Sequence, residues 1–220
     1  MSTPGLAPRS NGLPTQITAD QLLLVEGKDE CAFFNKWLPQ ITTSTVQIIE
    51  IGGKDNFNKR FPIIVKLNGF RDVKRLGFIR DAEDDAKGAF DSFKEILIRN
   101  RLTSASAAGT VQSDDLPHLG IWIMPDNRSP GSIETLCWNL IPQDDQRRTC
   151  TESFIECLRT TLPPNSLPKR IEKTKVQAYL GSRDKPLRET GRAAQAGVWD
   201  FTHGQLNNLR EFLVNLFQIR

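Results

Sequence analysis

Short apolar runs alternate along the chain with segments in which apolar residues recur every three or four positions. The short runs predict four buried strands, at residues 21–26, 46–51, 75–80 and 119–124. The recurring pattern predicts helices between these strands, at residues 30–38, 56–67 and 87–101. Strands that alternate with helices are typical of an α/β domain with a mainly parallel sheet.

The pattern changes after Pro130, where the strand signals stop. Four more helices are predicted, at residues 132–140, 152–162, 169–180 and 205–217. Prolines, glycines and small polar residues fill the start of the chain, and residues 103–116 lack periodicity, which predicts an exposed loop. We therefore expect a flexible tail at 1–16, an α/β domain at 17–142 and a helical extension at 143–220 that packs on it.

Composition narrows the class of protein. Hydrophobic residues make up 38% of the chain and charged residues 25%, a balance typical of soluble globular proteins. The apolar runs are too short for a membrane helix, which needs about 20 residues. With no signal pattern at the N-terminus, we expect a cytoplasmic protein without a membrane partner. The 4 cysteines form no CxxC pair and only 2 histidines are present, so we expect reduced thiols and no zinc site.

Acidic residues gather where the predicted strands end. Those at or just beyond the ends of the first, third and fourth strands are Glu26, Asp81, Glu83, Asp84, Asp85, Asp126 and Glu134. Because ligands bind at the carboxyl ends of parallel strands, these side chains are expected to converge on one edge of the sheet. Clustered carboxylates repel one another, and a divalent cation such as Mg²⁺ or Mn²⁺ relieves that repulsion.

Some of these acids have simpler interpretations. Asp84 and Asp85 could be the first residues of the helix that begins near Ala86. Asp126, next to Asn127, could be a turn residue. Glu26 has fewer alternatives, because it follows a buried strand directly and precedes a glycine.

Two of the acidic segments resemble the motifs of a known family. Residues 23–30, LLVEGKDE, are similar to the first motif of Toprim domains, and residues 81–85, DAEDD, to the second, usually Asp-x-Asp. Toprim domains occur in topoisomerases, bacterial primases, recombination mediators and the nucleases named for overcoming a lysogenization defect. A closer similarity is to a bacterial branch of Toprim-related proteins labelled as domains of unknown function. It rests on IGGKDN at 51–56, PDN at 125–127, Gly-x-x-Glu-x-Leu at 131–136, AYL at 178–180 and GVWD at 197–200.

The resemblance implies roles for individual acids. Glu26 would be the general base or a metal-linked acid, while Asp81 and Glu83 would complete the catalytic set and hold Mg²⁺ or Mn²⁺. Glu30 matches a second acid found four residues after the first glutamate in the lysogenization-type nucleases, and Glu134 is the candidate for a second metal site. Glu83 stands where the family usually has aspartate, a place that Asp84 or Asp85 could fill instead. The metal ligands expected from strand ends and resemblance together are Glu26, Glu30, Asp81, Glu83, Asp85, Asp126 and Glu134.

Basic residues provide candidate phosphate contacts. Lys28 and Lys54 each lie in a turn next to glycine, after a predicted strand. Lys173 and Lys175 belong to the basic stretch 165–192, which could hold a nucleic-acid backbone near the acidic edge. Both pairs could equally be solvated surface charges, and the overall net charge of +3 is too small to indicate nucleic-acid binding by itself.

The sequence and the resemblance together predict a Toprim-like α/β fold and a Mg²⁺-dependent nuclease that acts on DNA or RNA. Similar stand-alone proteins suggest a role in bacterial defence or repair, a partner protein such as an ATPase, and an oligomer as a possible state. Two alternatives remain: a non-catalytic metal- or nucleotide-binding interaction module, and a hydrolase of small phosphorylated molecules.

Overall fold

The computed structural model describes residues 12–218, apart from the side chain of Lys54. In chain order, strands β1 to β5 are Gln21–Val25, Val46–Glu50, Arg75–Asp81, Val111–Gln112 and His118–Met124. Helices α1 to α8 are Lys28–Ile41, Phe57–Ile64, Ala86–Arg99, Ile133–Asn139, Gln146–Thr161, Ile171–Gly181, Thr190–Gln195 and Asn207–Phe217. Short 3-10 turns lie at Lys54–Asn56, Phe70–Asp72, Pro164–Ser166 and Gly204–Leu206.

The strands form one sheet in the order β2-β1-β3-β5-β4. β1, β2, β3 and β5 run parallel, and helices connect them, which confirms the predicted mainly parallel α/β sheet. The structure adds a strand that was not predicted, β4, which pairs antiparallel with β5. It lies inside the segment 103–116 that was predicted to be an exposed loop. That prediction was wrong for β4 because a strand of two residues has no periodicity to reveal it. Ala105, in the same segment, is buried.

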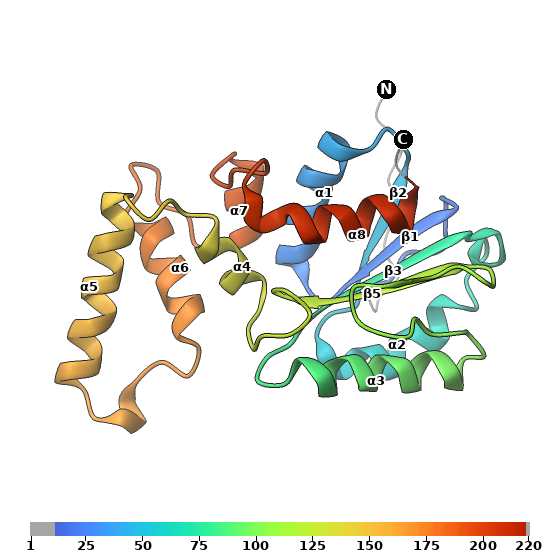
Figure 1. The fold of residues 1–220 in the computed structure, drawn as a ribbon, viewed down its shortest axis with the longest axis horizontal. Helices are drawn as coiled ribbons and strands as arrows, with labels where there is room; N and C mark the ends of the chain where they lie inside the picture. Colours follow the sequence, from blue (N-terminus) through green and yellow to red (C-terminus); the bar gives the residue numbers. More distant parts are fainter. Residues whose placement is uncertain (1–11, 219–220) are drawn as a thin grey trace.

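Alternate residues of each strand serve opposite faces of the sheet. Along β1, Leu22 and Leu24 pack into the core beneath α2 and α3, while Leu23 and Val25 pack into the core beneath α1 and α8. Figure 1 shows these two helix layers on either side of the sheet. A continuous apolar run in β1 therefore reflects a strand that is buried on both faces.

Two glycines allow α8 to approach the sheet closely. Gly77 of β3 and Gly120 of β5 are direct partners in the parallel register. A Cβ at Gly77 would lie 2.9 Å from a methyl carbon of Leu216, and one at Gly120 would lie 2.7 Å from the ring of Phe212. Both neighbours belong to α8, so the C-terminal helix packs on the sheet and completes one of its two cores.

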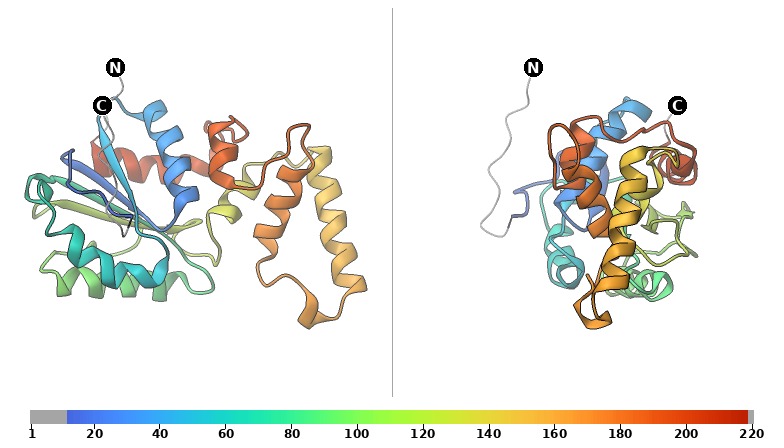
Figure 2. Two further views of the ribbon diagram at one scale, coloured as in Figure 1. Left: turned by 180° about the vertical axis from the view of Figure 1, so that it is seen from behind. Right: turned by 90° about the vertical axis from the view of Figure 1, so that its left-hand side faces the viewer.

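The α5–α6 hairpin, residues 146–181, extends away from the sheet at one end of the molecule (Figures 1 and 2). Its base is held by Arg148, whose guanidinium lies 4.8 Å from the ring centre of Trp138 and donates to the carbonyls of Trp138 and Ile141. The Tyr179 hydroxyl donates to Asp145 at 3.1 Å, just before α5 begins. The hairpin is therefore anchored through α4 at its base.

Several boundaries differ from those expected. Helix α1 continues through Pro39 to Ile41, because a proline in the last turn removes only one backbone hydrogen bond. The short α7 was not predicted, since its small residues show no apolar period. Most of the predicted tail, 1–16, lies outside the described residues, but Leu13 is fully buried in the core under α2.

Two further expectations concern the thiols and the membrane. All 4 cysteines are free, as predicted. Among the described residues, no helix has both the length and the apolar character needed to cross a membrane.

We expect Gly120→Ala to lower the free energy of unfolding by about 1–3 kcal/mol, because the new methyl group must displace Phe212 from a packed core. Urea denaturation followed by circular dichroism measures the change. Gly181→Ala is the matched control, since nothing lies within 4 Å of a Cβ there and alanine favours the helix. Equal stability of both variants would show that α8 is not packed closely on the sheet.

Candidate active site

The carboxyl edge of the sheet brings four acidic side chains together. Glu26 follows β1 directly, and Asp81 is the last residue of β3, the parallel neighbour of β1. Glu30 lies in the first turn of α1, which begins two residues after Glu26, and Glu134 lies in the first turn of α4. All four line one cavity of about 420 Å³. We call these four residues the acidic cluster.

Other polar groups complete the wall of this cavity. The remaining lining residues are Gly27, Lys28, Asp29, Gly53, Ile133, Arg170, Lys173 and Glu189. Asp29 also ties the site to α7, because its Oδ1 accepts from the backbone N–H of Gly191 at 3.0 Å. The cavity thus collects side chains from α1, α4, α6 and the segment before α7.

Asp81 occupies the centre of the acidic cluster. Its side chain is only 7% exposed, and Oδ1 accepts from the backbone N–H of Ile133 at 3.0 Å. Its own backbone N–H donates to Oε2 of Glu26 at 3.4 Å. Asp81 therefore connects the end of β1 with the start of α4.

Glu30 and Glu134 are also buried, at 6% and 7% exposure. Oε2 of Glu30 accepts from the N–H of Gly27 at 3.0 Å, as part of the cap of α1. The Ser132 hydroxyl donates to Oε2 of Glu134 at 2.8 Å, and Lys173 Nζ lies 3.3 Å from its Oε1. Each glutamate has local partners that orient it at the cavity wall.

Burial and the charges of their neighbours raise the pKa values of Glu30 and Asp81. Burial raises the pKa of Glu30 to about 7, and the negative charges of Glu26, Glu134 and Asp29 add to the effect. The pKa of Asp81 is raised well above its ordinary value by burial first, and then by the charges of Glu30, Glu26 and Glu134. A cation in the cavity would relieve this repulsion and favour the charged forms.

The donors of the acidic cluster are all carboxylate oxygens, which are the ligands that Mg²⁺ and Mn²⁺ prefer. The chemical type of these side chains therefore suits Mg²⁺ or Mn²⁺. Within residues 12–218, no three side chains of His, Cys, Asp or Glu lie close enough together to hold a metal ion in their present positions. The contacts explain this spacing, because Glu30 is turned toward Gly27 and Glu134 toward Lys173. Ion binding would require these two glutamates to exchange partners.

Three predicted site residues lie outside the acidic cluster. Glu83 lines a neighbouring cavity, where its Oε1 lies 2.6 Å from Nη2 of Arg170. Asp85 caps α3 by accepting from the N–H of Gly88 at 2.9 Å, the helix-start role that was one of its interpretations. Asp126 accepts from the backbone N–H groups of Arg128 and Ser129, the alternative turn role. The structure does not bring Asp85 or Asp126 to the predicted metal site, because both carboxylates satisfy local backbone donors.

The pKa of Asp126 agrees with that turn role. Partial burial alone would raise this pKa, but the hydrogen bonds from the backbone and hydroxyl of Ser129 outweigh it, so the pKa is lowered. Asp126 is thus a stable carboxylate of a turn, unlike the acids of the cluster.

The four lysines that were predicted to contact phosphate do not all lie at the site. Lys28 and Lys173 line the cavity of the acidic cluster. Lys175 lies instead over the Trp138 ring, 5.4 Å from its centre, and pairs with Glu172 at 3.8 Å. The side chain of Lys54 lies outside the described residues. Of the predicted lysines, the structure therefore brings Lys28 and Lys173 to the site, while Lys175 is occupied elsewhere.

Sequence reasoning missed Asp29 and Arg170. Asp29 lies between Lys28 and Glu30 in the first motif, and this position is the feature of the sequence that could have placed it at the site. Arg170 lies in the basic stretch 165–192, but nothing in the linear sequence distinguishes it from the other basic residues there. Only the packing of α6 beside α4 places Arg170 at the cavity.

Comparison with known protein families assigns the chain to a family. One family model, described as protein of unknown function (DUF3226), matches residues 20–218. The chain belongs to DUF3226. Comparisons with curated proteins and with solved structures gave no match. The DUF3226 match runs from the start of β1 to just beyond α8, so the family includes the α5–α6 hairpin as well as the sheet and the acidic cluster.

The raised pKa of Glu30 predicts how stability depends on pH in the absence of divalent ions. The folded state holds the Glu30 proton more tightly than the unfolded chain does, so its contribution to stability is full below pH 4.5 and is lost as pH rises to about 7. Glu30→Gln keeps an acceptor for Gly27 and removes the charge. We expect the variant's stability advantage over wild type to grow by about 1–3 kcal/mol from about pH 5 to about pH 8.

Urea denaturation in EDTA across this pH range measures that advantage. Glu95→Gln, at an exposed position on α3, is the control and should follow wild type throughout. A constant difference between Glu30→Gln and wild type would contradict the interpretation of the acidic cluster as a site of charge repulsion.

Proposed function

We propose that the protein is a Mg²⁺-dependent phosphodiester hydrolase that acts on DNA or RNA through the acidic cluster. The observation that carries the proposal is the convergence of Glu26, Glu30, Asp81 and Glu134 in one cavity at the carboxyl edge of a parallel sheet. Burial and the neighbouring carboxylates raise the pKa values of Glu30 and Asp81, and a divalent cation would turn the repulsion at this site into binding energy.

The placement of the acids supports a Toprim-like fold. A glutamate after the first strand, a glycine turn into a helix, and an aspartate at the end of the adjacent parallel strand all agree with the two motifs on which the resemblance rests. The role in bacterial defence or repair and the partner ATPase are implied by the resemblance alone and stay predictions.

The positions of the residues suggest a separate role for each. Asp81 and Glu26 would hold the metal from adjacent strands, with Glu30 and Glu134 completing the ligand set from the two helix starts. A bound divalent ion supplies an activated water and stabilises the leaving oxygen of a phosphodiester. Glu26 would accept a proton from the attacking water, and the Lys28 ammonium group would hold the phosphate that is cleaved.

We expect Glu26→Gln to lower Mg²⁺-dependent cleavage of plasmid, linear or single-stranded substrate by about 100-fold or more, since the amide can neither accept a proton nor bind the ion as a carboxylate does. Gel assays of cleavage with Mg²⁺ or Mn²⁺ measure the loss, and EDTA should abolish cleavage. Asp126→Asn is the matched control, because it removes a carboxylate of the same edge that serves a turn, and should keep cleavage within about 3-fold of wild type.

Metal binding is expected to be visible without catalysis. Mg²⁺ or Mn²⁺ should raise the melting temperature of the wild type near pH 8, because an ion that binds only the folded state stabilises it. Asp81→Asn retains an oxygen that can accept from Ile133 but loses the buried charge, so its melting temperature should no longer respond to Mn²⁺.

These two assays separate the alternatives. Ion binding without cleavage of nucleic acid would reject the nuclease and leave the hydrolase of small phosphorylated molecules and the metal-binding interaction module. Absence of both cleavage and ion binding would reject the proposal and leave an interaction module that binds no metal.

A further inference from the structure

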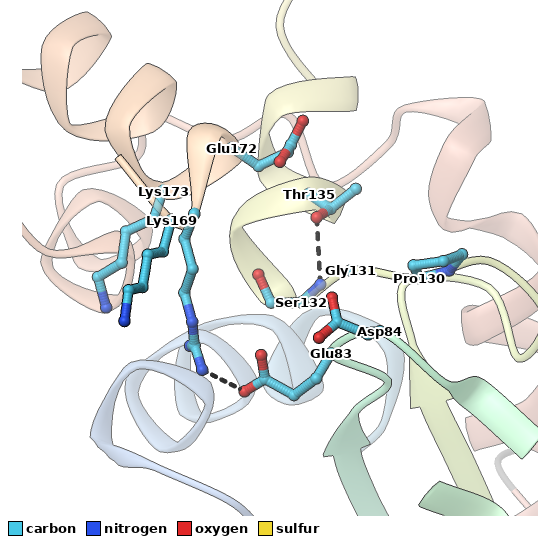
Figure 3. A pocket seen from close by; sticks show the side chains of 10 residues that line it. Glu83, Asp84, Pro130, Gly131, Ser132, Thr135, Lys169, Glu172 and Lys173 are labelled. Atoms are coloured by element: carbon cyan, nitrogen blue, oxygen red, sulfur yellow. Dashed lines mark hydrogen bonds and ion pairs between the residues drawn. The ribbon is translucent and has the colours of Figure 1, made fainter. Parts of the chain in front are cut away.

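A second cavity adjoins the acidic cluster. It has a volume of about 290 Å³ and lies between the loop after β3, the start of α4 and the start of α6 (Figure 3). Arg170 and Lys173 line both cavities, so the two share one wall. We call these two neighbouring cavities, which reach from Glu83 to Glu26, the groove; they lie where the sheet domain meets the α5–α6 hairpin.

Three cations from the hairpin lie along the second cavity, and two of them also line the first. Lys169, Arg170 and Lys173 all line the second cavity and are all exposed to solvent. In Figure 3 the side chains of Lys169 and Lys173 extend in the same direction, while Glu172 points away from them. We call Lys169, Arg170 and Lys173 the cation trio.

The present partners of the cation trio are carboxylates of the sheet domain. Arg170 pairs with Glu83, and Lys173 pairs with Glu134 at 3.3 Å. The side chains of Arg170 and Lys173 are 55% and 47% exposed, whereas those of their partners Glu83 and Glu134 are 23% and 10% exposed. A buried carboxylate such as Glu134 needs another cation when Lys173 leaves it. A divalent ion held at the acidic cluster would take over Glu134 and so free Lys173 for a phosphate group.

The chemistry of the groove suits a phosphate backbone rather than a base. The second cavity is lined by charged and small polar residues together with Pro130, and none of its lining residues is aromatic. Bases bind by stacking on aromatic rings, which are missing from this wall, whereas Lys and Arg bind phosphates of any sequence.

We propose that the cation trio binds the phosphate next to the one held at the acidic cluster, so that the substrate is a nucleic-acid strand of several nucleotides and not a small phosphate ester. The inference rests on the proposed function and extends it to the substrate class. The α5–α6 hairpin then has a direct role, because it carries the cations that hold the strand across the groove.

Binding of a fluorescein-labelled single-stranded oligothymidylate of about 12 nucleotides tests the inference. Fluorescence anisotropy is measured in EDTA and again with Ca²⁺, at several salt concentrations. The double variant Arg170→Gln/Lys173→Gln should bind about 10-fold more weakly or worse. The slope of log affinity against log salt should fall by about 1.4, since each phosphate contact to a single strand contributes about 0.7.

The double variant Lys185→Gln/Arg188→Gln is the matched control. It removes the same charge from exposed positions of the same basic stretch that line neither cavity, so it should bind almost as wild type does. Melting temperatures of both double variants verify that the fold is intact. Thymidine monophosphate should compete with the oligonucleotide far less well than an unlabelled strand of equal length.

Equal weakening in both double variants would overturn the inference, as would failure of the wild type to bind the strand or competition by the mononucleotide at equal concentration. The outcome is independent of the cleavage assay. Cleavage that needs Glu26 but is indifferent to Arg170 and Lys173 would leave the proposed function standing without the inference. Selective loss of binding in the Arg170/Lys173 variant, with no cleavage by any form, would support the inference and reject the nuclease.

Discussion

The parallel pairing of β1 with β3 is the interaction on which the site depends. Val25 lies opposite Ile79, so the two strands end at the same edge, and Glu26 and Asp81 must share that edge. The turn at Gly27 then starts α1 at once and places Glu30 in its first turn. A shift in this register would move the acids apart. Burial, and after it the charges of the neighbouring acids, raises the pKa values of Glu30 and Asp81 at this edge.

The packing of the two hydrophobic cores opposes the charge repulsion within the acidic cluster. Aromatic side chains fill both sides of the sheet, including contacts of Phe57 with Phe93 and of Trp37 with Phe201. These large buried surfaces hold the carboxylates at a separation that the charges alone would increase. The same relation explains why the loss of one carboxylate charge is expected to stabilise the metal-free protein, although it removes a functional group.

The strands and the longest helices could be predicted because their apolar periods are local features of the chain. The position of Glu26 at the edge of the sheet could be predicted for the same reason, since a carboxylate after a buried strand is visible in the sequence. The short pairing of β4 and the small helix α7 could not, because each is stabilised by distant contacts rather than by a pattern of its own. Asp85 and Asp126 were expected at the site because strand ends were predicted well, but the sequence does not reveal which way a loop carboxylate turns.

The position of the α5–α6 hairpin links the parts of the protein that sequence reasoning left separate. Arg148, Trp138 and Tyr179 fix the hairpin to α4, and α4 carries Glu134 into the acidic cluster. The start of α6 consequently lies beside the carboxyl edge of the sheet, and its cations face the acids across a groove. In the proposed function a strand of phosphates would contact both sides at once, with the acidic cluster holding the divalent ion and Arg170 and Lys173 holding the strand. The hairpin and the sheet would then serve one function, and the family match extends over both.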